Sequence, residues 1–167
     1  MTQFSLWLDE PDALEQLDQR SAGNALYYEA GLNLIKNGWA LLPAVQRPED
    51  CEQARKDYAQ YIEETPEASQ NADANARHFR LTNFHLYSEA AMRIGKNPIV
   101  MGFLDFIFAK RAAVYTSLTF EYSTEQPLHR DVPYFYTFPE GQFVGAWSPL
   151  EDIHPDAGPL SYVWFFC

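Results

Sequence analysis

The sequence has few cysteines and few basic residues, and each shortage excludes a class of protein. Its two cysteines, Cys51 and Cys167, lie far apart and form no metal-spacing motif, so we expect each thiol to be buried or incidental. Lysine and arginine number 12 against 23 acidic residues, for a formal net charge of −11. Phosphate backbones and anionic membrane surfaces would therefore be repelled.

Long hydrophobic runs are also absent. The first ten residues contain no basic stretch followed by an apolar one, as a signal peptide would. The most apolar later segment, residues 100–109, is short and contains Asp105. We therefore expect a cytoplasmic protein that has neither nucleic acid nor a membrane as its partner.

Apolar and aromatic side chains are abundant, at 47% and 16% of the residues. This composition argues against disorder, because there is ample surface to bury. We predict a single domain over residues 1–167, since domains cluster at roughly 100–150 residues. Residues 1–110 should be mainly helical, and residues 111–167 should contain the strands.

Helix signals mark the first part of the chain. Residues 9–20 and 24–36 are predicted helices, and Asn37-Gly38 is a stop signal for the second. A third helix should begin at Pro48, where apolar residues recur at helical spacing. A fourth, residues 97–110, begins with Asn-Pro and is apolar nearly all round, which predicts a buried helix.

Short strands are predicted at residues 39–45 and 78–86, with an exposed connection at residues 65–77. Four later runs rich in Val, Tyr, Phe, Thr and Trp are predicted strands: residues 113–122, 128–133, 142–150 and 160–166. Helices followed by closely spaced strands predict an α+β fold. The helices should pack on one face of an antiparallel β structure such as a jelly roll.

The sequence His129-Arg130-Asp131 is the sharpest chemical signal in the chain. Residues i and i+2 of a strand project from the same face, so His129 and Asp131 could bind one ion. An imidazole nitrogen and a carboxylate oxygen are two parts of the 2-His-1-carboxylate triad, which holds Fe(II) and leaves positions open. The third part, a distal histidine, is missing. A bare His-x-Asp sequence is common by chance, so the surrounding sequence decides whether a metal site is indicated.

The sequence around this pair resembles the phytanoyl-CoA dioxygenase family over residues 118–162. The resemblance rests on three stretches in the family's order: residues 126–135 (QPLHRDVPYF), 145–152 (GAWSPLED) and 155–160 (PDAGPL). Several elements in the right order make it specific. The helical region before them is similar to the family only loosely.

The resemblance implies a double-stranded β-helix, cupin-like, with Fe(II) held by His129 and Asp131 at the mouth of the barrel. It implies a 2-oxoglutarate-dependent dioxygenase that hydroxylates a small organic substrate and releases succinate and CO2. Trp147 matches a family tryptophan that lines the 2-oxoglutarate pocket; a core tryptophan is the alternative. Family relatives that halogenate replace the carboxylate with a small residue, so Asp131 favours hydroxylation.

The family pattern continues with a distal histidine and a basic residue that clamps 2-oxoglutarate, and no residue here matches either. We therefore expect the jelly roll to be incomplete at the C-terminus and the chain to be a truncated form with little turnover. Unpaired strand edges should favour self-association. Two alternatives stay open: a non-catalytic cupin-like binding domain, and an inactive truncated fragment of such an oxygenase.

For the remaining candidate site residues, structural roles are alternatives to functional ones. Arg80 could bind an acidic substrate, since guanidinium pairs with carboxylate or phosphate, or it could form a surface ion pair. We expect His154 to be exposed or to cap a turn. For His78 and His85 we expect surface or hydrogen-bonding roles.

Small and aromatic residues near the His-x-Asp sequence also carry expectations. We predict core and cross-strand packing for Tyr134, Phe135 and Tyr136. Gly158, which follows Asp156-Ala157, should occupy a turn.

Overall fold

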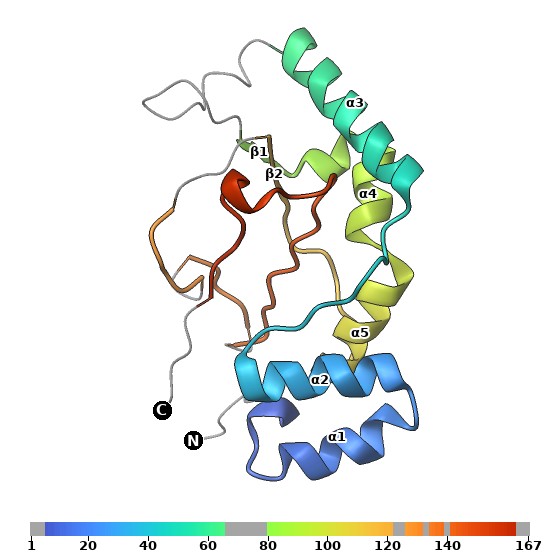
Figure 1. Ribbon diagram of the computed structural model, residues 1–167, viewed down its shortest axis with the longest axis vertical. Helices are drawn as coiled ribbons and strands as arrows, with labels where there is room; N and C mark the ends of the chain where they lie inside the picture. Colours follow the sequence, from blue (N-terminus) through green and yellow to red (C-terminus); the bar gives the residue numbers. More distant parts are fainter. Residues whose placement is uncertain (1–5, 66–79, 122–125, 132–133, 139–140, 163–167) are drawn as a thin grey trace.

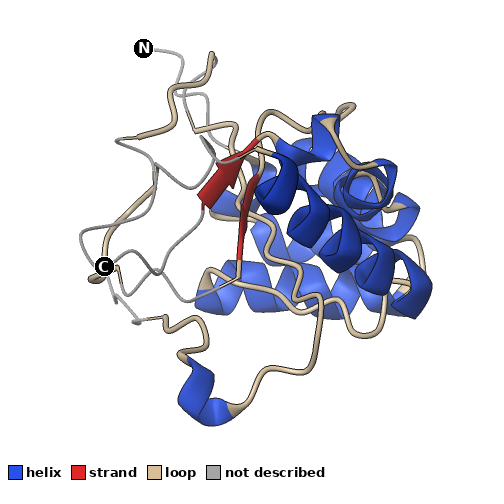
Figure 2. Ribbon diagram, turned by 90° about the horizontal axis from the view of Figure 1, so that it is seen from above, coloured by secondary structure: helices blue, strands red, loops and turns tan. Residues whose placement is uncertain are grey.

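A computed structural model describes residues 6–65, 80–121, 126–131, 134–138 and 141–162. Helices lie along one side and one end of the molecule, and extended segments occupy the other side (Figures 1 and 2). The described helices and strands are α1 (Ala13–Ser21), α2 (Ala25–Asn37), α3 (Pro48–Glu64), β1 (Arg80–Thr82), α4 (Glu89–Gly95), α5 (Pro98–Phe108) and β2 (Leu118–Phe120). Short 3₁₀ turns are η1 (Trp7–Asp9), η3 (Phe84–Leu86) and η4 (Pro155–Ala157).

The residues that predicted the ends of α2 and the start of α3 lie at these positions in the structure. The side chain of Asn24 accepts a hydrogen bond from the Tyr27 amide at 3.1 Å, which caps the first turn of α2. Gly38 ends α2 with φ +74°, a left-handed conformation that glycine adopts without strain. Pro48 is the first residue of α3, where its missing amide hydrogen costs nothing. Both predicted helices are confirmed.

Helix α5 begins as predicted but is buried on one stripe only. The Asn97 side chain accepts from the amides of Ile99 at 2.9 Å and Val100 at 3.3 Å, which caps the helix. Phe103 and Ile107 are buried against α2, whereas Ile99 is 43% exposed. The prediction of an all-round buried helix was wrong, because the packed neighbours cover α5 from one side.

One helix boundary and one short helix were missed. Residues 9–20 were predicted as one helix, but α1 begins at Ala13, because residues 7–9 form the separate turn η1. Helix α4, only seven residues long, was not predicted; the Ser88 side chain caps it by accepting from the Ala91 amide at 3.0 Å. Seven residues are too few for a clear apolar period.

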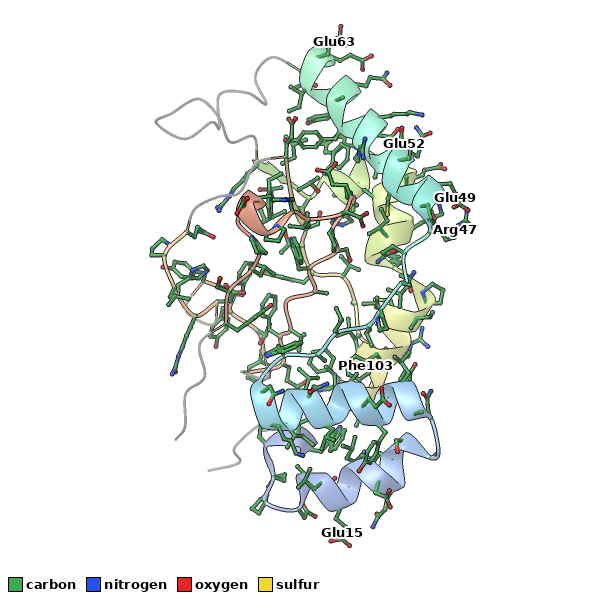
Figure 3. The ribbon with its side chains drawn as sticks, in the orientation of Figure 1. Glu15, Arg47, Glu49, Glu52, Glu63 and Phe103 are labelled. Carbon is green, nitrogen blue, oxygen red and sulfur yellow. The ribbon has the colours of Figure 1, made fainter. Side chains whose placement is uncertain are left out.

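Three apolar clusters hold the helices together. The α2–α5 cluster contains Ala30, Phe103 and Ile107, and Figure 3 shows Phe103 where α5 meets α2. The α3–α4 cluster contains Ala54, Ala90 and Ile94. The third joins α3 to β1 and η3 through Tyr58, Leu81 and Phe84. Of the described helices, α3 thus packs against strand β1.

Helices α1 and α2 are in close contact. A Cβ atom added to Gly31 of α2 would lie 2.6 Å from Cδ1 of Leu17, a fully buried side chain of α1. Acidic side chains instead occupy the outside: Glu15 on α1 and Glu49, Glu52 and Glu63 on α3 point away from the molecule (Figure 3).

The sheet is smaller than predicted. Strands β1 and β2 pair antiparallel, with Arg80 opposite Phe120 and Thr82 opposite Leu118. The predicted strands at residues 78–86 and 113–122 thus shrink to three residues each within the described part. The predicted exposed connection at residues 65–77 lies almost wholly outside the described residues, as does His78.

The other predicted strands are not strands in the described part of the chain. Residues 39–45, 128–131, 142–150 and 160–162 form no hydrogen-bonded ladder there. Their composition favours extended backbone, but a strand also needs a neighbouring backbone, so the strand predictions were wrong for these residues. The described residues form a mixed structure of helices and a two-stranded sheet, not a double-stranded β-helix. None of the described helices is long and apolar enough to cross a membrane.

Candidate metal centre

His129 and Asp131 come together, although not on a strand. Nε2 of His129 lies 3.2 Å from Oδ1 of Asp131, and their side chains are 36% and 52% exposed. The Asp131 carbonyl accepts hydrogen bonds from the amides of Tyr134 at 2.8 Å and Phe135 at 3.2 Å. These bonds lie after the pair in the sequence, and neither His129 nor Asp131 belongs to a strand.

The ring of His129 is oriented by the backbone. Its Nδ1 atom lies 2.8 Å from the Pro127 carbonyl oxygen, which can only accept a hydrogen bond. Nδ1 therefore carries a proton, and in the neutral ring the Nε2 lone pair faces Asp131. The ring of Tyr134 meets the imidazole edge to face, with centroids 6.1 Å apart.

This arrangement places two acceptors face to face unless a cation lies between them. A proton would satisfy them by forming an imidazolium–carboxylate ion pair, and a metal ion would satisfy them by binding both. Ligand atoms about 2.1 Å from one metal ion and at right angles to each other are about 3.0 Å apart. The observed separation of 3.2 Å is close to that value, so the pair fits two adjacent metal ligands.

A second segment lies beside Asp131. Residues 142–151, hereafter the connecting segment, pass close enough that a Cβ atom added to Gly145 would lie 3.7 Å from Oδ2 of Asp131. In the same segment the ring of Phe143 stacks on Phe135, with centroids 4.7 Å apart. Neither Pro127 nor Gly145 was predicted to contribute to this site. Composition gives no signal for either role, since both depend on the folded backbone.

No third donor joins the pair in the part of the chain that the structure describes. Within those residues no group of three His, Cys, Asp or Glu side chains could hold a metal ion. The described residues therefore offer two side chains, and not three, of the kinds that form a facial triad.

Trp147 and Arg80 lie on different elements. Trp147 is 44% exposed in the connecting segment, two residues after Gly145, so it is not a core tryptophan. Arg80 is half-buried at the start of β1, opposite Phe120.

His85 and His154 have the ordinary roles expected of them. His85 is 9% exposed, and its Nδ1 lies 2.6 Å from Oγ of Ser117. His154 caps η4: its Nδ1 accepts from the Asp156 amide at 3.2 Å, and its side chain is 74% exposed. The turn-capping prediction for His154 is confirmed.

The predictions for the nearby small and aromatic residues had mixed outcomes. Gly158 follows η4 with φ +73°, which confirms the predicted turn. Tyr134 and Tyr136 are 74% and 81% exposed, so the prediction of core packing was wrong for them. Phe135 is half-buried against Phe143. Tyrosines of this kind need a facing sheet to bury them, and the described residues provide none.

Comparison with known proteins identifies the family. The model of the phytanoyl-CoA dioxygenase family matches residues 34–163, which is most of the chain and includes α3, α4 and α5. The family relationship thus begins well before residue 118, where the resemblance in sequence became specific. Searches of curated proteins and of solved structures give no match. The chain belongs to the phytanoyl-CoA dioxygenase family, whose members are oxygenases with a jelly-roll fold.

Proposed function

We propose that this chain carries the iron-binding pair of an Fe(II)/2-oxoglutarate-dependent dioxygenase that hydroxylates a small organic substrate and releases succinate and CO2. Nε2 of His129 and Oδ1 of Asp131 are the proposed ligands. The observation that supports this most is the 3.2 Å separation of Nε2 of His129 from Oδ1 of Asp131, with the other ring nitrogen, Nδ1, beside the Pro127 carbonyl. Family membership supplies the reaction class.

Each residue has a definite part in this proposal. The Pro127 carbonyl fixes the His129 tautomer, and the Tyr134 ring edge limits rotation of the imidazole. Iron with bound 2-oxoglutarate supplies the oxidising chemistry. Trp147 is the proposed wall of the 2-oxoglutarate pocket, and Arg80 is a proposed contact for an acidic substrate. The presence of the Asp131 carboxylate favours hydroxylation over halogenation.

A non-catalytic role is the second candidate, and a specific observation favours it. The described residues offer two donors rather than three, and both are open to water. Metal affinity depends on the complete set of ligands and on their outer hydrogen bonds. A chain with only this pair would bind iron weakly and would act as a cupin-like binding domain or an inactive fragment.

Anaerobic titration with ferrous iron and 2-oxoglutarate tests the ligand assignment. The metal-to-ligand absorption band of wild type should be lost in His129→Ala and in Asp131→Ala. His154→Ala is a matched control, because His154 also precedes an aspartate by two positions but uses Nδ1 to cap a turn. A normal band in wild type that persists in His129→Ala would refute the assignment.

Succinate release separates the two candidate functions. With iron, 2-oxoglutarate and oxygen, an oxygenase should form succinate, and Asp131→Ala should abolish it. Iron binding without any succinate from wild type would favour the non-catalytic domain.

A further inference from the structure

The connecting segment is attached to the helices by apolar contacts on both sides of Gly145. Val144 packs against the α2–α5 cluster, and Leu150 packs against the α3–α4 cluster. Figure 1 shows this part of the chain, in orange to red, running between the helices and the segment that carries His129. Gly145, where an added Cβ atom would lie 3.7 Å from Oδ2 of Asp131, thus directly follows the anchored Val144.

Gln46 provides the polar anchor nearest to Gly145. Its Nε2 donates to Oγ of Ser148 at 3.2 Å and to the Ile94 carbonyl at 3.4 Å. Its Oε1 accepts from Nδ2 of Asn97 at 3.4 Å, and Asn97 is only 8% exposed. Gln46 therefore ties the connecting segment to the junction of α4 and α5.

A further ion pair is present but contributes little. Arg55 on α3 lies 3.3 Å from Glu151, but their side chains are 48% and 65% exposed. Exposed ion pairs are screened by water and salt and are worth little. The half-buried Gln46–Ser148 hydrogen bond is better protected, so it should fix the segment more strongly.

We propose that Gln46 is a positioning residue for the iron-binding pair, and this inference rests on the proposed function. Val144 and Ser148 hold the backbone on either side of Gly145, and Gly145 limits where the Asp131 carboxylate can lie. Gln46 acts on Asp131 through Ser148 and Gly145 and contacts neither ligand. Helices remote in sequence thereby set the geometry of the pair.

Ferrous affinity, measured from the anaerobic 2-oxoglutarate band, tests the effect on the site. Gln46→Ala should weaken iron binding by about threefold to tenfold, the range expected for one lost hydrogen bond. Ser148→Ala breaks the Gln46–Ser148 hydrogen bond and should also weaken iron binding, and the double variant should lose no more than Gln46→Ala alone, because both single variants break that bond. Ser148→Thr keeps the hydroxyl and should retain wild-type affinity.

Gln53→Ala is the matched control for side-chain loss. Gln53 donates at 2.7 Å to Asp57 one turn along α3, so its removal breaks a local hydrogen bond and leaves the connecting segment attached. It should bind iron as wild type does. Equal affinities for wild type and Gln46→Ala would overturn the proposal.

Amide hydrogen exchange without iron provides a readout that does not depend on the proposed function. Exchange in peptides covering residues 126–131 and 142–151 should rise in Gln46→Ala and stay unchanged in Gln53→Ala, while α1 and α2 exchange as in wild type. If wild type binds no iron, the proposed function fails and exchange still decides the role of Gln46. Unchanged exchange in Gln46→Ala would refute the positioning role.

Discussion

The helical part of the molecule, residues 6–65 and 80–110, differs sharply from the extended part, which is residues 111–121, 126–131, 134–138 and 141–162. Every described apolar side chain that is buried belongs to the helical part, and the last is Ile107. In the extended part, Leu128 is 71% exposed and Tyr136 is 81% exposed. Helices form through local hydrogen bonds and need only a neighbouring helix, whereas strands need partners from elsewhere. The candidate metal centre lies in the extended part and is held through its contacts with the helical part.

Substitutions in the core of the helical part should cause the largest loss of stability. Ile107→Ala should lower the free energy of unfolding by about 2–5 kcal/mol, because Ile107 is fully buried in the α2–α5 cluster. Leu128→Ala, at a largely exposed position, should cost about 0.5 kcal/mol or less. Urea titrations followed by helical circular dichroism measure both. Equal losses of unfolding free energy in the two variants would show that the two parts do not differ in packing.

A smaller difference in stability loss is expected between substitutions of two capping residues, Asn97 in the helical part and His154 in the extended part. Asn97→Ala should cost about 1–2 kcal/mol, since the buried amide caps α5 and donates to the Val45 carbonyl at 2.8 Å. His154→Ala removes an exposed cap from the short turn η4 and should cost less than about 0.5 kcal/mol. Thermal unfolding of both variants provides the comparison. A His154→Ala loss as large as that of Asn97→Ala would show that the extended part is also tightly packed.

We propose that the exposed apolar side chains of the extended part mediate self-association. Leu128 and Leu41 form a matched pair, because they are 71% and 69% exposed in the extended and helical parts. Leu128→Ser should weaken association by about tenfold, as burying a leucine is worth about 1.5 kcal/mol or more. Leu41→Ser should leave association unchanged. Analytical ultracentrifugation would contradict the proposal if wild type stayed monomeric, or if the two variants behaved alike.

The smallest effect concerns Cys51 on α3, in the helical part. Burial, with the Asp50 carboxylate as a second cause, raises the pKa of this thiol above its ordinary value of 9.0. The thiol of the unfolded chain ionises first as pH rises. The stability from this group is therefore complete below the ordinary pKa and is lost as pH rises through the folded pKa. Between about pH 8 and 10, the midpoint temperature of thermal unfolding should fall less steeply with pH in Cys51→Ala than in wild type. Parallel curves would show that burial of the thiol does not matter.

The sequence predicted features that depend on near neighbours. Asn97 and Gly38 bound their helices as expected, and His154 caps a turn, because each signal acts within a few residues. Residues 142–150 were predicted as a strand from composition, but pairing depends on distant backbone that composition does not reveal. His129 and Asp131 were expected to project from one face of a strand; they lie close together, but neither belongs to a strand. The Pro127 carbonyl that orients the imidazole and the approach of Gly145 required the folded chain.

The central claim is that His129, and not His154, presents a lone pair for iron. Histidine ring resonances recorded during anaerobic addition of ferrous iron test it directly, because a paramagnetic ion broadens the signals of its ligands. His129 signals should disappear first, and His154 signals should persist, since Nδ1 of His154 already accepts a backbone hydrogen bond. Equal broadening of both histidines, or earlier loss of His154, would contradict the account.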